Sequence, residues 1–108
     1  MLPKKNRVNK KEVDEIFKKG RFLNSSNLTF KFLIKNNLKT KKISFIAPKS
    51  AAKLAVKRNL LRRRGYSALG RHFQEFPSGI SGVFIFKKPL NSVIEIENEI
   101  KTFIHKIN

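Results

Sequence analysis

The sequence contains no cysteine and no tryptophan, and only 7 of its 108 residues are acidic. Without cysteine, the chain can form neither a disulfide framework nor a zinc site with thiolate ligands. The longest apolar run, residues 83–86, is far too short to span a bilayer, and no apolar segment follows the basic N-terminal residues as it would in a signal peptide. We therefore expect a soluble, cytoplasmic protein.

Positive charge dominates what the sequence does contain. Lysine and arginine total 25, which gives a formal net charge of +18. Such a charge repels itself across a small fold, so a polyanionic partner is expected to offset it. Membrane binders usually concentrate their charge on one helix or tail, whereas the cations here run from Lys4 to Lys106. The pattern favours a nucleic acid as the partner and no membrane.

The first part of the chain predicts a basic arm followed by a helix. Residues 1–8 are basic, contain a proline and are interpreted as an extended arm. Asn9 can cap a helix, with Glu12 three residues later in the capping-box position. Apolar residues then recur on one face at helical spacing, and Gly20 marks the expected end of the helix.

Two strands are predicted next. In residues 28–34 the side chains alternate between two faces, and residues 43–47 alternate in the same way. A polar turn separates the two segments, so we predict that they pair as an antiparallel hairpin. Pro48 ends the second strand.

A long helix and a buried strand are predicted in the second half. The helix begins between Ser50 and Leu54 and ends near Leu69. Gly65 lies inside this helix and costs about 1 kcal/mol relative to alanine, so a break or bend is expected to be tolerated there. Residues 82–86 form a continuous apolar run, which is typical of a strand covered on both faces.

A second capping box, formed by Ser92 and Glu95, opens a last helix whose apolar residues recur at spacings of three and four. The element order is therefore helix, two strands, helix, strand, helix, with room for one further short strand. The sequence shows no internal repeat and no second domain. It predicts a single α+β domain over residues 1–108, an α-β sandwich with three helices on a small, mostly antiparallel sheet.

The densest basic segment, residues 53–64, lies within the long predicted helix. At helical spacing, Arg58 and Arg62 form one row of neighbours, and Asn59 and Arg63 form the next. Guanidinium groups bind phosphate in a bidentate way and stack on bases, while an amide can hydrogen-bond the 2′-OH groups of RNA. Taken alone, this face is equally well explained as a solvated surface or as a loose binder of any nucleic acid.

The residues around this cluster resemble the signature of the bacterial ribonuclease P protein family. That family carries Ser-Lys-Lys, a short spacer and Ala-Val-x-Arg-Asn-Arg-x-Lys/Arg-Arg on a helix. Residues 48–63 read Pro-Lys-Ser, a spacer and then Ala-Val-Lys-Arg-Asn-Leu-Leu-Arg-Arg. The departures are Leu60 in place of the third-position arginine, Tyr66 where many members have arginine, and Pro48 and Ser50 within Ser-Lys-Lys.

The resemblance implies a left-handed βαβ crossover around the basic helix and a role in removing the 5′ leader of precursor tRNA. In that family the chain is the non-catalytic protein subunit of an endoribonuclease, and the RNA subunit carries the active site and binds most of the Mg²⁺. No catalytic residue and no metal site are therefore implied in the protein. The implied partners are the catalytic RNA and precursor tRNA, with one protein monomer per ribonucleoprotein.

The resemblance also assigns residues to two surfaces. The surface for the RNA subunit would comprise Lys49, Lys53, Arg58, Asn59, Arg62 and Arg63. The cleft for the single-stranded leader, between the sheet and the first helix, would be lined by Phe17, by Val13 at a position that is often phenylalanine, and by Phe30 or Phe32. The alternative is that Phe30 and Phe32 are core residues, because one face of their strand must pack against a helix.

Two other RNA-binding functions fit the same electrostatics. One is a ribosomal or other structural RNA-binding protein without a part in cleavage, and the other is a nonspecific nucleic-acid chaperone. A protein nuclease fits poorly, because a metal-dependent nuclease clusters its carboxylates, whereas the acidic residues here are dispersed and the two histidines are isolated. Identifying the RNA that the purified protein retains would separate these functions.

Overall fold

Residues 4–107 are described by a computed structural model of the chain. Its elements are η1 (Lys4–Asn6), α1 (Lys10–Lys19), β1 (Arg21–Asn24), β2 (Leu28–Ile34), β3 (Lys42–Ile46), α2 (Ala55–Gly70), η2 (Phe73–Glu75), β4 (Ile80–Phe86) and α3 (Val93–Ile107). The predicted α+β class is confirmed, with β1 as the further short strand.

The four strands form one mixed sheet in the order β1-β2-β4-β3. β2 pairs antiparallel with both β1 and β4, whereas β3 runs parallel to β4. The predicted hairpin of residues 28–34 with 43–47 is therefore wrong, because β4 lies between these two strands. β4 takes the interior position because it is apolar and largely buried on both faces. α2 connects the parallel strands β3 and β4, and the left-handed sense of this crossover stays a prediction.

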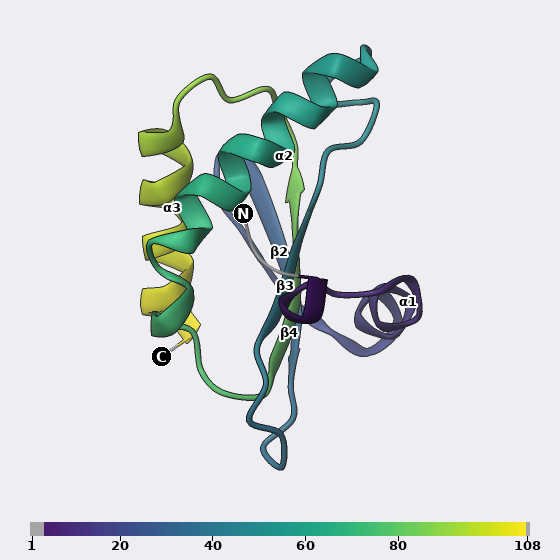
Figure 1. The fold of residues 1–108 in the computed structure, drawn as a ribbon, viewed down its shortest axis with the longest axis vertical. Coiled ribbons are helices and arrows are strands. Elements are labelled where there is room, and N and C mark those ends of the chain that lie inside the picture. Colours follow the sequence, from purple (N-terminus) through teal and green to yellow (C-terminus); the bar gives the residue numbers. More distant parts are fainter. Residues whose placement is uncertain (1–3, 108) are drawn as a thin grey trace.

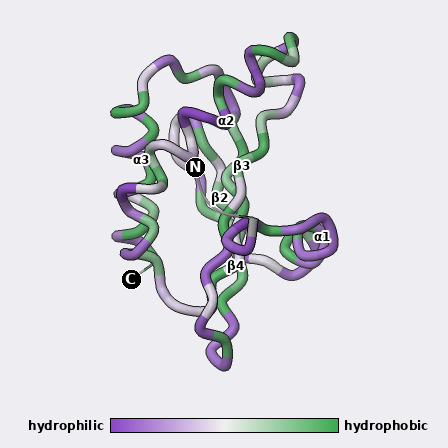
Figure 2. The backbone as a smooth tube through the Cα atoms, viewed as in Figure 1, coloured by the Kyte–Doolittle hydropathy of each residue, from purple (hydrophilic) through white to green (hydrophobic). Residues whose placement is uncertain are grey.

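Helices cover both faces of the sheet (Figure 1). α2 and α3 lie together on one face, and α1 lies alone on the other. Figure 2 shows that the hydrophobic positions gather along the central strands, while α1 is largely hydrophilic. The main core therefore lies between the sheet and the α2–α3 layer, and α1 leaves part of the opposite sheet face open.

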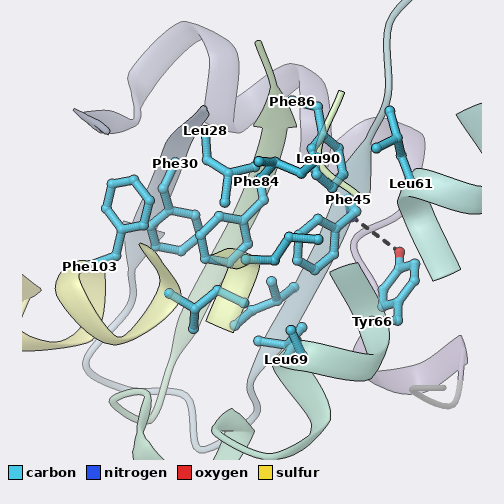
Figure 3. Packing of buried hydrophobic residues seen from close by; sticks show 14 of the residues in the cluster. Leu28, Phe30, Phe45, Leu61, Tyr66, Leu69, Phe84, Phe86, Leu90 and Phe103 are labelled. Carbon is cyan, nitrogen blue, oxygen red and sulfur yellow. Dashed lines mark hydrogen bonds between the residues drawn. The ribbon is translucent and has the colours of Figure 1, made fainter. Parts of the chain in front are cut away.

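Phenylalanine rings from neighbouring strands build this core (Figure 3). The Phe84 ring lies between those of Phe30 and Phe45, with centroid separations of 4.2 and 5.0 Å, and Phe103 of α3 packs at 5.7 Å. Such aromatic pairs contribute about 0.5–1.5 kcal/mol each beyond the burial of their area. The core thereby holds α2 and α3 in a fixed position on the sheet.

Two adjacent residues of α2, Gly65 and Tyr66, pack against the edge strand β3. Gly65 faces the ring of Phe45, and a Cβ atom there would lie 2.6 Å from ring carbon Cδ1. α2 runs unbroken through this position, so glycine provides a close approach rather than the bend that its presence suggested. The backbone N–H of Phe45 donates to the hydroxyl oxygen of Tyr66 at 3.2 Å (Figure 3). Tyr66 thus satisfies a backbone donor of the edge strand.

The N-terminal segment packs on the sheet instead of extending away from it. Residues 4–6 form the 3₁₀ turn η1, so the extended arm predicted for residues 1–8 is wrong over this part, and residues 1–3 lie outside the described residues. The backbone N–H of Val8 donates to the Ser44 hydroxyl of β3 at 2.8 Å.

The predicted capping box at Asn9 and Glu12 is confirmed, with both reciprocal hydrogen bonds present. Gly20 ends α1 as predicted. At the start of α3, the backbone N–H of Glu95 donates to the Ser92 hydroxyl at 3.4 Å, which is one of the two hydrogen bonds of the second predicted box.

Candidate nucleic-acid interface

The exposed side of α2 carries the first candidate surface. Asn59, Arg62 and Arg63 lie together around a shallow hollow of about 280 Å³, and we call these three residues the α2 surface. The guanidinium of Arg62 donates to the amide oxygen of Asn59. Asn59 and Arg63 are exposed, so the Asn59 NH₂ group and the Arg63 guanidinium are accessible to a ligand.

Arg58 does not project outward with these three residues. Its Nη1 donates to the carbonyl oxygen of Ala52 at 3.1 Å and to that of Lys53 at 2.7 Å. The guanidinium is partly buried and ties the segment before α2 to the first turn of the helix. The predicted four-residue patch is therefore confirmed for three members, whereas Arg58 positions the approach to the helix.

Arg7 joins the α2 surface from the N-terminal segment. Its guanidinium carbon lies 5.1 Å from the ring centroid of Tyr66, within cation–π range, and both residues line the same hollow as Arg62 and Arg63. Arg7 was not among the predicted site residues, because it lies in a basic stretch that is distant in sequence from α2. The fold adds a third guanidinium to the surface.

The two predicted lysines lie near the start of α2. Lys49 is exposed in the loop after β3, and Lys53 lies at a second hollow of about 410 Å³. The cations Lys57 and Arg64 also line this hollow, and Leu60 forms part of its apolar wall. Leu60, which replaces the arginine of the family signature, thus makes this part of α2 apolar.

Within residues 4–107, no carboxylate forms an ion pair with the α2 surface. Ion pairs in residues 4–107 join Glu12 to Lys42, Glu15 to Lys35, Glu97 to Arg71, and His72 to both Glu75 and Glu97. None of them includes Arg58, Arg62 or Arg63. Because Arg62 and Arg63 have no acidic partner within the described chain, their guanidinium groups remain available to phosphate oxygens, whereas that of Arg58 is bonded to backbone carbonyls.

The second candidate surface lies where α1 meets the open face of the sheet. Phe17 of α1 is 48% exposed, and the Nζ of Lys31 on β2 lies 4.5 Å from its ring centroid. Val13, one turn earlier on α1, is partly buried, while Ile16 between them is buried. Phe17 thus presents an aromatic ring to solvent beside a cation, and its role in binding the leader stays a prediction.

The prediction that Phe30 or Phe32 provides an exposed leader-binding ring is wrong. Their side chains are 0% and 3% exposed and belong to the main core. Successive side chains of a strand point to opposite faces, and those of Phe30 and Phe32 point toward the α2–α3 layer. The alternating residue Lys31 points toward α1. The alternating pattern of β2 shows that Phe30 and Phe32 lie on one face and Lys31 on the other. It does not show which face packs against α1 and which against the α2–α3 layer.

No group of three or more histidine, aspartate or glutamate residues is placed to hold a metal ion within residues 4–107. In the same range, no helix is long and apolar enough to cross a membrane.

Residues 2–108 match the sequence profile of the family described as Ribonuclease P. The chain belongs to the bacterial RNase P protein family. As a family member, it is a component of RNase P, an endoribonuclease ribonucleoprotein. A comparison with curated protein sequences finds no significant match.

Solved structures of RNase P proteins share the fold. The protein from Thermotoga maritima superposes with a TM-score of 0.80 at 19% identity, covering 94% of this chain and 97% of that one. Two structures of the protein from Staphylococcus aureus give TM-scores of 0.78 and 0.75 at 17% and 20% identity. They cover 94% and 99% of this chain, and 94% and 92% of theirs. At these identities the likeness establishes the fold, and the assignment to the family rests on the sequence profile.

Proposed function

We propose that this chain is the protein subunit that docks on the catalytic RNA of RNase P through α2 and holds the 5′ leader of precursor tRNA on the α1 side of the sheet. The observation that carries the proposal is the α2 surface, where Arg62 and Arg63 lie beside Arg7 around one hollow. Within residues 4–107, neither Arg62 nor Arg63 forms an ion pair with a carboxylate. Three guanidinium groups in one hollow suit a folded RNA, whose backbone presents several phosphates within a short distance.

Asn59 gives this surface a group that distinguishes RNA from DNA. Its amide oxygen accepts from Arg62, and the side chain is exposed, so its NH₂ group can donate to RNA. A 2′-OH group is both a donor and an acceptor, and it is present only in RNA. Arg58 contributes indirectly, because its guanidinium donates to the backbone carbonyl of Lys53 and holds the segment that carries this lysine. The contact proposed between Lys53 and the RNA therefore depends on Arg58.

The leader is proposed to lie across Phe17 and Lys31. Leader sequences differ among precursor tRNAs, so a useful contact must tolerate any base. Stacking on an aromatic ring meets this need and is worth about 1–3 kcal/mol per base. Lys31 adds a cation for the backbone that joins the stacked bases.

In this proposal the RNA subunit performs the cleavage, with Mg²⁺ bound mainly by that RNA. Several carboxylates of the protein instead form hydrogen bonds that stabilise its fold. Glu12 closes the cap of α1, Glu99 accepts hydrogen bonds from Ser25 and Asn27, and Glu97 pairs with His72. The protein would therefore act by binding and positioning, as one monomer per RNA.

Reconstitution with a bacterial RNase P RNA at low magnesium tests the proposal. We expect the wild-type protein to increase the cleavage rate of precursor tRNA, and the double substitution Arg62→Ala with Arg63→Ala to need a much higher protein concentration for the same effect. A wild-type protein that retains ribosomal RNA and leaves cleavage unchanged would point instead to a structural RNA-binding role.

A further inference from the structure

Only two of the ten phenylalanines have strongly exposed rings. Seven lie in the core, and Phe73 is partly buried against it. Phe17 and Phe22 are 48% and 61% exposed. Isolated apolar residues are common on protein surfaces, so exposure alone means little. These two rings are not isolated, because they flank the same lysine on the same face of the sheet.

The strand register places Phe22 beside Lys31. Phe22 of β1 and Lys31 of β2 are direct antiparallel partners, and such partners project to the same face with Cβ atoms about 4.5–5.5 Å apart. Lys31 also reaches the Phe17 ring, with its Nζ 4.5 Å from the centroid. Phe17, Lys31 and Phe22 therefore form a continuous row across α1, β2 and β1, which we call the aromatic strip.

The exposure of Phe22 is fixed by the sheet and does not depend on a mobile side chain. Its neighbours Arg21 and Leu23 point to the opposite face, where Arg21 lies 5.0 Å above the Phe32 ring and Leu23 packs against the core. A change of one residue in register would exchange the two faces and remove Leu23 from the core. The fold therefore holds the Phe22 ring on the α1 side, in solvent.

We propose that Phe22 is a second stacking platform for the single-stranded 5′ leader, with Lys31 binding the backbone phosphate between the bases on Phe17 and Phe22. This inference rests on the proposed function and extends it to β1, a strand whose position was not predicted from the sequence. The contact of Lys31 with the half-exposed ring of Phe17 is a weak cation–π interaction. The ammonium group can therefore exchange this ring for a phosphate when RNA binds.

The experiment measures the affinity of the reconstituted holoenzyme for precursor tRNAs with leaders of increasing length and for mature tRNA. Phe22→Ala is compared with Phe22→Tyr, which keeps a π-face, and with Phe22→Leu, which keeps an apolar side chain without one. Ile94→Ala is the matched control, because Ile94 is 63% exposed on α3, away from the aromatic strip. Thermal unfolding verifies that each variant is folded.

We expect Phe22→Ala to weaken binding of long-leader precursors by about fivefold or more, which is the lower end of what one lost stacking contact costs. The loss should vanish for mature tRNA and for leaders too short to reach β1. Phe22→Tyr should bind as the wild type does, Phe22→Leu should resemble Phe22→Ala, and Ile94→Ala should have no effect.

Three results would overturn the inference. They are full affinity in Phe22→Ala, full affinity in Phe22→Leu, or an equal loss for precursor and mature tRNA. The proposed function fails separately, if the wild-type holoenzyme itself does not prefer precursor over mature tRNA. If that preference exists and Phe22→Ala retains it completely, only the role of Phe22 is lost.

Discussion

Removing two guanidinium groups from the α2 surface should change how binding to the catalytic RNA depends on salt. Each cation that neutralises a phosphate releases condensed counterions, which adds about 0.7 to the log-affinity versus log-salt slope for single strands and about 0.9 for duplex DNA. Arg62→Ala with Arg63→Ala should therefore flatten the slope by about 1.4–1.8. Affinity at fixed salt should also fall, because a hydrogen bond to a charged group contributes about 1.5–3 kcal/mol.

The assay is a filter-binding titration of the catalytic RNA at several salt concentrations. Lys101→Ala with Lys106→Ala is the matched control, since it removes the same two charges from exposed positions of α3. Its slope should change far less than that of the α2 variant. Equal changes in both variants would refute the surface assignment, because they would show that only net charge matters. Arg58→Ala should mainly lower stability, since its guanidinium bonds to backbone carbonyls.

Three further predictions concern the fold that supports the site. Tyr66→Phe leaves the Phe45 N–H without its hydroxyl acceptor and should lower the free energy of unfolding by about 1–3 kcal/mol in urea titrations; an unchanged value would contradict this. Gly65→Ala should destabilise by about 1–3 kcal/mol through overpacking against Phe45, whereas a stabilised variant would show that helix propensity prevails. Hydrogen bonds with Glu75 and Glu97 raise the pKa of His72 above 6.5. The contribution of protonated His72 to stability is complete below pH 6.5 and is lost as the pH rises through the folded-state pKa. The free energy of unfolding of the wild type should therefore fall as the pH rises through this interval. In His72→Gln the free energy of unfolding should depend less on pH over the same interval.

Local patterns in the sequence were sufficient for the helices and their caps. Asn9 with Glu12 predicts the start of α1 because a capping box depends only on residues three apart. Strand order depends on pairing between distant segments, and proximity in sequence favoured a hairpin of residues 28–34 with 43–47. The deciding property was that β4 is apolar on both faces, which places it between them.

The candidate site shows the same division between local and long-range information. Helical spacing correctly grouped Asn59, Arg62 and Arg63, but it could not show that Arg58 turns back to the preceding loop. Arg7 reaches the α2 surface only because the N-terminal segment packs on β3. Phe22 depends on the register of an edge strand, β1, whose position in the sequence was not predicted.

Directed cleavage of the catalytic RNA from a single tethered position tests the docking of α2 most directly. The natural chain has no cysteine, so one introduced cysteine can carry an iron chelate without competing sites. Ser67 is exposed and continues the row of Asn59 and Arg63 along α2, while Thr102 is exposed on α3. We expect hydroxyl radicals from Ser67→Cys to cut the catalytic RNA at discrete positions and those from Thr102→Cys to cut it weakly. Equal or absent cleavage from the two positions would contradict docking through α2.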